Sequence, residues 1–215
     1  MAGSASTLSA LRRLVSERFP QAPRAVADVL PSGVAAVDDA VGGLPRQALT
    51  ELVGAAPSGG SALFIGQLLH VTRRAGGRVA LIDGGDAFDP ASYPPDDMRH
   101  LVWLRCRTWA DALPLADLFA RDANLDLVVL DLRMAAKNVL RRIPAAAWYR
   151  LHRAVKPTHL ALVVITPWAL VPSAQLRLAL ESSHGLAAQT ERRPRLAAGL
   201  PVARQRQRIS ADLAS

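Results

Sequence analysis

The sequence contains only one cysteine, Cys106, among its 215 residues. A single cysteine cannot form a disulfide within the chain, which excludes the disulfide-stabilised folds of small secreted domains. The sequence also has no run of about 18 uncharged apolar residues, the length that a membrane-spanning helix needs. Arginines interrupt the first twenty residues where a secretion signal would have its apolar core. These absences predict a protein of the reducing cytoplasm without a membrane partner.

Acidic residues are outnumbered, with 18 Asp and Glu against 26 Lys and Arg, which gives a net charge of +8. Such an excess favours anionic partners, either nucleic acid or an acidic protein surface. The alternative is an arginine-rich composition that serves no specific partner. The five histidines are scattered without the spacing of metal ligands, so we expect no metal site.

Half of the residues are hydrophobic, which is enough for one α/β domain with a core. Continuous apolar segments alternate with amphipathic ones. The expected strands are residues 48–54, 78–83, 100–106, 125–132 and 159–167; we interpret the segment 100–106 as a buried strand like its neighbours. The expected helices are residues 61–76, 108–123 and 133–156, the last broken at Pro144. This alternation predicts a mostly parallel sheet covered by helices on both faces.

The sequence divides into a core and two extensions. We expect an N-terminal amphipathic helix and linker over residues 1–29, a core over 30–190, and an arginine-rich tail over 191–215. The tail carries six arginines against two acids and has little periodicity, which is typical of a loosely attached arm. Both extensions are candidates for docking on other proteins. The candidate partner-binding residues are Leu8, Leu11, Leu14, Phe19, Arg204, Arg206 and Arg208.

The stretch "VGAAPSGGSAL", residues 53–63, almost matches the phosphate-binding loop G-x-x-x-x-G-K-[ST]. Gly54, Gly59 and Ser61 have the required spacing, but Gly60 takes the place of the lysine. A strand before the loop and a helix after it provide the geometry in which backbone N–H groups face a phosphate. Glycine lacks the charge with which the lysine contacts the β- and γ-phosphates. The sequence therefore predicts a degenerate nucleotide-binding loop.

Asp131 ends the apolar strand "LDLVVLD". In phosphate-loop proteins an aspartate at this point helps to hold Mg²⁺ together with the loop hydroxyl, here Ser61. The alternative is that Asp131 only ends the strand and caps a helix that begins at Arg133. The sequence leaves both interpretations open.

Several motifs in order resemble those of the RecA recombinases. The segment "LPSGVAAVDDAVGGLPRQALTELVGAAPSGGSAL" resembles the first part of the RecA core, and "ALIDGGDAFDP" resembles the next part. "LDLVVLDL" is similar to the Walker B strand, and "LHRAVKPTHLALVVITP" to the helix and strand that follow it. The resemblance covers residues 30–183 and implies a RecA-like fold.

Three positions depart from the RecA pattern. Gly60 replaces the lysine of the loop, Gly85 stands where RecA carries its catalytic glutamate, and Pro167 stands where RecA has the glutamine that senses the γ-phosphate. The resemblance therefore implies a protein without catalytic residues or a required cofactor. Weak ATP binding through the remaining backbone groups stays open.

With its short length and these three losses, the sequence resembles the ImuA family of the bacterial SOS response. That resemblance implies a non-polymerase accessory role in damage-induced mutagenesis and translesion DNA synthesis. Its implied partners are the polymerase-like ImuB and an error-prone replicative-type polymerase, with RecA and DNA as further candidates. Two alternatives remain: a weak or partner-completed ATPase of the RecA class that acts on DNA, and an SOS-linked structural interaction protein that does not bind DNA.

The segment from Leu132 to Lys156 contains seven cations and no acid. We expect Arg133, Lys137 and Arg141 to line one face of a helix, because they are spaced at i, i+4 and i+8. Like charges at this spacing repel, and a bound polyanion would offset the repulsion. The predicted DNA-binding residues are Arg133, Lys137, Arg141, Arg142, Arg150 and Arg153. The alternative is a solvated helix face.

Overall fold

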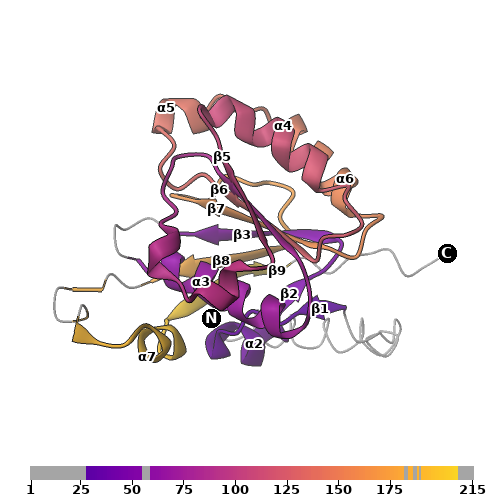
Figure 1. Cartoon of the computed structure of the whole chain (residues 1–215). Helices are drawn as coiled ribbons and strands as arrows, with labels where there is room; N and C mark the ends of the chain where they lie inside the picture. Colours follow the sequence, from indigo (N-terminus) through magenta and orange to yellow (C-terminus); the bar gives the residue numbers. More distant parts are fainter. Residues whose placement is uncertain (1–27, 55–58, 182–183, 186–187, 189, 208–215) are drawn as a thin grey trace, which may run out of the picture.

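A computed structural model of the protein describes residues 28–54, 59–181, 184–185, 188 and 190–207 (Figure 1). The predicted N-terminal helix with Leu8, Leu11, Leu14 and Phe19 lies outside the described residues, and so does Arg208 of the predicted tail. Among the described residues, no helix has both the length and the apolar character needed to cross a membrane.

The described chain forms a seven-stranded sheet with the order β5-β4-β6-β7-β3-β8-β9. Its strands are β3 (Ala48–Val53), β4 (Val79–Asp83), β5 (Leu101–Arg105), β6 (Leu127–Asp131), β7 (Ala161–Thr166), β8 (Leu176–Leu180) and β9 (Val202–Gln207). All neighbouring strands are parallel except β8 and β9, which are antiparallel. The predicted α/β fold with a mostly parallel sheet is therefore confirmed.

The inner strands β3, β4, β6 and β7 are buried along their whole length. Their sequences are nearly continuous apolar runs, as strands covered on both faces require. The strand β5 is an edge strand and is partly exposed, so its interpretation as a buried strand is wrong. Leu101 and Trp103 pack against one core and Leu104 packs against the other, but each stays partly exposed because only β4 lies beside β5 in the described sheet.

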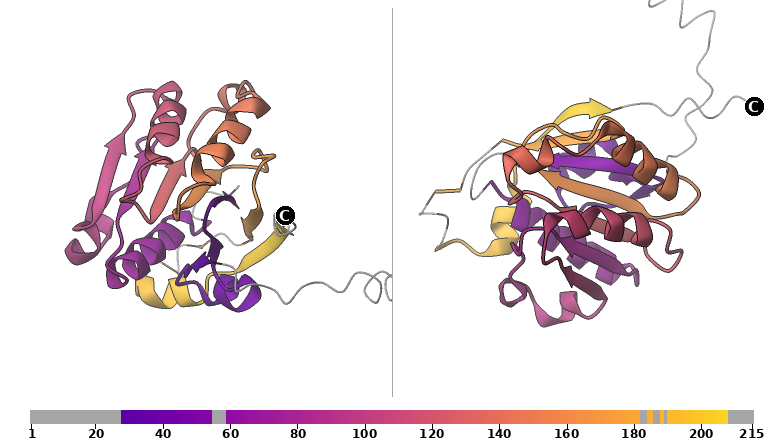
Figure 2. Two further views of the ribbon diagram at one scale, coloured as in Figure 1. Left: turned by 90° about the vertical axis from the view of Figure 1, so that its right-hand side faces the viewer. Right: turned by 90° about the horizontal axis from the view of Figure 1, so that it is seen from above.

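Helices cover both faces of the sheet (Figures 1 and 2). One face carries α2 (Ala35–Val41), α3 (Ser61–Arg74) and α7 (Arg193–Ala198). The other face carries α4 (Trp109–Phe119), α5 (Lys137–Leu140) and α6 (Ala145–Val155). Two short 3₁₀ helices (Pro90–Ser92 and Pro95–Met98) follow β4, and β1 (Val29–Leu30) pairs with β2 (Leu44–Pro45) beside the main sheet. Each face has its own apolar core, one around Phe64 of α3 and one around Trp148 of α6.

The stretch from Arg193 to Gln207 is part of the folded core. The helix α7 packs against α3, β9 extends the sheet beside β8, and Leu200 between them is buried. The prediction of a loosely attached tail is therefore wrong for this stretch, which includes Arg204 and Arg206. An edge strand tolerates arginine and glutamine because one of its sides faces solvent, and this hides the strand in the sequence.

Candidate functional site

The candidate site lies where the carboxyl ends of the parallel strands meet. The strand β3 leads into Gly54, β4 ends at Asp83 and β6 ends at Asp131. Asp83 and Asp131 are opposite each other in the register of β4 and β6. The predicted strand before the glycine loop and the predicted helix after it are confirmed as β3 and α3, which begins at Ser61.

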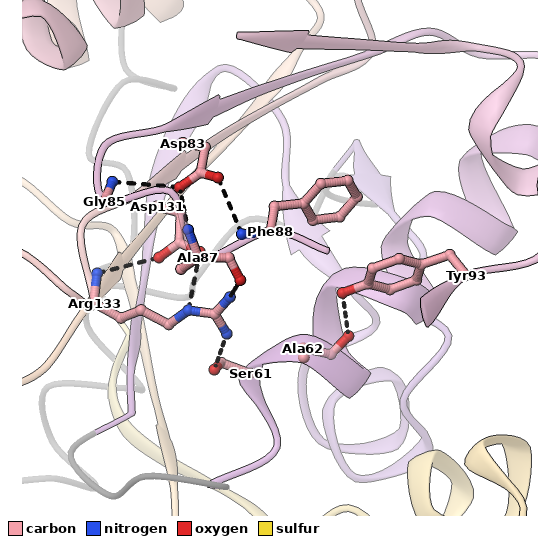
Figure 3. Close-up of polar contacts among 9 residues, drawn as sticks. All are labelled: Ser61, Ala62, Asp83, Gly85, Ala87, Phe88, Tyr93, Asp131 and Arg133. Carbon is pink, nitrogen blue, oxygen red and sulfur yellow. Dashed lines mark hydrogen bonds and ion pairs between the residues drawn. The ribbon is translucent and has the colours of Figure 1, made fainter. Parts of the chain in front are cut away.

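Arg133 connects three segments at this edge of the sheet (Figure 3). Its Nη1 donates a hydrogen bond to Ser61 Oγ over 2.6 Å, and its Nη2 donates to the carbonyl oxygen of Ala87 over 3.0 Å. Its Nε lies 3.1 Å from Asp131 Oδ2, and its backbone N–H donates to Asp131 Oδ1. Only 14% of the Arg133 side chain is exposed. The guanidinium therefore holds together the start of α3, the end of β6 and the loop after β4.

This guanidinium contacts the two side chains that correspond to the magnesium-binding pair of phosphate-loop proteins. Phosphate-loop proteins hold Mg²⁺ with the loop hydroxyl and the aspartate of the Walker B strand. Mg²⁺ needs oxygen ligands at about 2.0–2.1 Å in near-octahedral geometry. Here an internal cation already contacts Ser61 Oγ and lies against the Asp131 carboxylate. With Arg133 in this position the two side chains do not fit a metal ion.

Neither sequence interpretation of Asp131 describes its environment fully. The helix after β6 begins at Lys137, so Asp131 does not cap a helix that starts at Arg133. Asp131 is almost completely buried, and this burial raises its pKa to about 6. The Arg133 guanidinium opposes the rise in pKa, and the nearby Asp83 adds to it. Asp131 is therefore mostly ionised at neutral pH, where its negative charge pairs with Arg133.

Asp83 positions the loop that supplies the Ala87 carbonyl. Its buried carboxylate accepts hydrogen bonds from the backbone N–H groups of Gly85, Ala87 and Phe88, at 3.3, 2.9 and 3.0 Å. Sequence reasoning missed this role. An aspartate directly before two glycines at the end of an apolar strand is the signal that could have indicated it.

Gly85, the position that corresponds to the missing glutamate, lies close to the segment after Arg133. A Cβ atom at Gly85 would lie 2.7 Å from the Cβ of Met134. A larger residue would therefore push the loop after β4 away from this segment. Glycine at this position allows the close approach on which the Arg133 contacts depend.

Gly60, the position of the missing lysine, has a backbone that favours glycine. Its φ of +92° is in the left-handed region, and it is the N-cap of α3. A Cβ atom at Gly60 would lie within 2.3 Å of Leu200 Cδ1. Both the backbone conformation and the contact with Leu200 exclude an unstrained lysine.

The C-terminal segment, residues 193–200, covers the start of α3. The helix α7 lies beside α3 in Figures 1 and 2. The Arg193 guanidinium stacks 4.9 Å above the ring of Tyr93, whose hydroxyl donates to the carbonyl oxygen of Ala62 over 3.1 Å. The residues of this segment therefore lie against the first turn of α3, where a bound phosphate would need space.

Pro167, the third position that departs from RecA, follows β7 and precedes a loop that a buried ion pair holds. Glu51 on β3 accepts hydrogen bonds from Arg177 on β8 and from the backbone N–H groups of Leu170 and Val171. Glu51 is fully buried, and Arg177 is its direct neighbour in the sheet register. Sequence reasoning missed this pair. The signal was a single acid and a single arginine within two apolar strands.

The structure separates the predicted DNA-binding residues. Arg133 points into the site, and α5 covers only Lys137–Leu140, so the predicted helix face of Arg133, Lys137 and Arg141 is wrong. The reason is that residues 133–136 form the turn that places Arg133 beside Asp131. Lys137 lies 5.8 Å from the ring of Trp168, and Arg150 pairs with Asp117. The other three predicted residues are exposed: Arg141, Arg142 and Arg153.

Comparison with known proteins agrees with this architecture. A protein RecA from Streptomyces avermitilis is 34% identical over 118 residues, which are 53% of this chain and 31% of that protein. A protein RecA from Tropheryma whipplei is 36% identical over 118 residues, which are 53% of this chain and 27% of that protein. The matches therefore span about a third of the length of these relatives. The family model of the RecA N-terminal domain matches residues 17–140, more than half of the sequence, and the chain belongs to this family.

Proposed function

We propose that this protein is a RecA-like adaptor that does not turn over ATP. The observation that carries the proposal is the position of the Arg133 guanidinium between Ser61 and Asp131. An ATPase of this fold uses these two side chains to hold the metal that neutralises phosphate charge. A guanidinium that contacts both of them supports a structural use of the site.

The residues at the other positions of the site support the same conclusion. Gly60 supplies no ammonium group for the phosphates, and Gly85 supplies no carboxylate to orient a water molecule. Charge-stabilising and water-positioning groups each account for about 10²- to 10³-fold in rate, so the loss of one of each brings turnover close to background. Leu200 and α7 restrict access to the start of α3 as well.

The biological role that we propose is support of translesion DNA synthesis after damage. The resemblance to ImuA supports this role, and the retained RecA-type core supports a function in binding. The proposed partners are an ImuB-like protein and an error-prone replicative-type polymerase, with RecA as a further candidate.

Affinity purification tests this role. The full chain with a tag is expressed at its native level, and its associated proteins are identified with and without DNA damage. We expect the two polymerase-family proteins to co-purify after damage. Cells that express the tag alone are the control. Absence of both proteins from the damaged sample contradicts the adaptor role, and ATP hydrolysis by a purified complex would instead favour an ATPase that a partner completes.

A further inference from the structure

The loop after β4 connects the C-terminal segment to the Arg133 site. This loop comprises residues 84–93 and includes the first 3₁₀ helix. Its Ala87 carbonyl accepts the hydrogen bond from Arg133 over 3.0 Å. Its last residue, Tyr93, lies under Arg193 of α7, whose guanidinium carbon is 4.9 Å from the centre of the ring. Two guanidinium groups from distant parts of the sequence therefore contact the same loop.

Close packing joins the two ends of this loop. The rings of Phe88 and Tyr93 are stacked, with their centres 4.9 Å apart and 15° between their planes. Both side chains are buried, and the backbone N–H of Phe88 donates to Asp83 over 3.0 Å. Closely packed side chains cannot move independently. A displacement of the Tyr93 ring would therefore also displace Phe88 and the neighbouring carbonyl of Ala87.

The start of α3 contacts both the C-terminal segment and Arg133. Leu200 is 2% exposed, and its Cδ1 atom lies close enough to Gly60 to leave no room for a side chain there. The next residue, Ser61, accepts the hydrogen bond from Arg133 over 2.6 Å. The C-terminal segment therefore reaches the Arg133 site by a second route, directly through the backbone at the start of α3.

Tyr93 is the residue where these contacts meet (Figure 3). Its hydroxyl donates to the carbonyl oxygen of Ala62, in the first turn of α3, over 3.1 Å. Burial raises the pKa of Tyr93, and the positive charges of Arg193 and Arg133 both oppose this rise. The phenol is therefore within electrostatic reach of both guanidinium groups, one from the C-terminal segment and one from the site.

The C-terminal segment is held by few buried side chains. Its helix α7 has six residues, which is too short to be stable without packing. Ala197 and Leu200 are its buried apolar residues, whereas the Arg195 side chain is 81% exposed and pairs with Glu191 at the surface. Local release of such a segment costs less free energy than unfolding of the sheet.

We propose that the C-terminal segment is a latch that controls how firmly Arg133 is held in the site. In the closed state described here, Arg193 and Leu200 fix the loop after β4 and the start of α3 against the guanidinium. In the released state the loop and the helix separate, and Arg133 loses its hydrogen bonds to Ser61 and Ala87. The segment leads directly into β9, so a partner that draws β9 away from β8 would release the latch. The latch does not depend on the proposed adaptor role.

Hydrogen exchange of the full chain, measured by NMR at single amides, tests the latch. Arg193→Ala should speed exchange at Ala87 and Phe88 about threefold to fivefold, which is the factor that an exposed cation–π contact contributes. Leu200→Ala removes a buried side chain, so it should speed exchange by at least about 30-fold at the start of α3. The amide to follow there is that of Phe64, which donates to the carbonyl oxygen of Gly60.

A second measurement reports on Arg133 itself. The Arg133 guanidinium lowers the pKa of Asp131, so release of the latch should raise this pKa in both Arg193→Ala and Leu200→Ala. Carboxyl ¹³C NMR measures the titration. In an Arg133→Gln background, Arg193→Ala should leave the pKa of Asp131 unchanged, because the cation that the latch controls is gone. A segment that only adds stability would not change this titration.

The matched control is Arg195→Ala, which removes an exposed arginine from the same helix and should change neither measurement. Circular dichroism establishes that every variant is folded. Faster exchange that is confined to residues 193–200 overturns the proposal, and so does an unchanged pKa of Asp131 in both latch variants. Equal effects of Arg195→Ala and Arg193→Ala also overturn it. These measurements use neither ATP nor a partner, so the latch and the adaptor role fail separately.

Discussion

The Nη1 atom of Arg133 lies 2.6 Å from the hydroxyl oxygen of Ser61, 72 residues earlier in the chain. This contact joins the loop after β6 to the first residue of α3. Together with the ion pair to Asp131, it engages the two side chains that hold the metal ion in a phosphate-loop ATPase. The core is therefore held together at this edge by its own side chains.

The first prediction concerns stability. Arg133→Gln leaves the buried Asp131 carboxylate without its cation, and loss of one partner of a buried pair costs about 3 kcal/mol or more. We expect urea denaturation to show this decrease in the free energy of unfolding. The control is Arg150→Gln, which removes the ion pair with Asp117. The Arg150 side chain is 53% exposed, so this substitution should lower the free energy of unfolding by less than about 1 kcal/mol. Equal effects of the two substitutions would contradict a special role of Arg133.

The second prediction concerns the titration of Asp131. Burial raises its pKa from 3.8 to about 6, so the folded state binds the proton more tightly than the unfolded state. The contribution of Asp131 to stability therefore decreases as the pH rises from about 4 to about 6. Since Arg133 lowers this pKa, Arg133→Gln should raise it further. Carboxyl ¹³C NMR measures both values, and an unchanged pKa in the variant would show that Arg133 does not act on Asp131.

The third prediction concerns the position of the missing lysine. Gly60→Ala should destabilise the protein in two ways. The φ of +92° costs an alanine about 1–2 kcal/mol, and its Cβ atom overlaps with Leu200. Gly76→Ala is the control, because Gly76 has a φ of +74° but no atom within 4 Å of its added Cβ. The cost at Gly60 should exceed the cost at Gly76, and it should shrink in a Leu200→Ala background. Equal costs in thermal denaturation would show that Leu200 does not restrict this position.

The fourth prediction concerns the buried pair on β3 and β8. Glu51→Gln leaves the Arg177 guanidinium without a carboxylate partner. It also weakens the hydrogen bonds that the side chain at position 51 accepts from the backbone N–H groups of Leu170 and Val171. We expect a loss of about 3 kcal/mol or more in unfolding experiments. The control Glu191→Gln removes an exposed pair with Arg195 and should change stability by less than about 1 kcal/mol. A loss at Glu51 as small as that at Glu191 would refute this structural role.

The order of elements could be predicted because it depends on local patterns. The buried strands β3, β4, β6 and β7 are apolar along nearly their whole length, and glycine marks the turn before α3. The strand β9 could not be recognised, since an edge strand rich in arginine resembles a solvated tail. Its place in the sheet depends on pairing with β8, which is distant in the sequence.

The role of Arg133 could not be predicted for a related reason. In the sequence it is one of seven cations in a basic segment, and nothing local distinguishes it from Arg141. Its distinction arises from the fold, which places Ser61 and the Ala87 carbonyl within reach of its guanidinium. Asp131 can be identified in the sequence because it ends a recognisable strand. Its pairing with Arg133 can be seen only in the three-dimensional arrangement.

The most direct test of the central claim is phosphate release from ATP by the purified full chain, with and without Mg²⁺. If Arg133 has taken the place of the metal, the wild type should release phosphate at the background rate, and Asp131→Ala should give the same value. Substitution of Gly60 by lysine should not restore release, because Gly85 still lacks a carboxylate. Robust Mg²⁺-dependent release by the wild type that Asp131→Ala abolishes would contradict the adaptor role and identify the protein as an active ATPase.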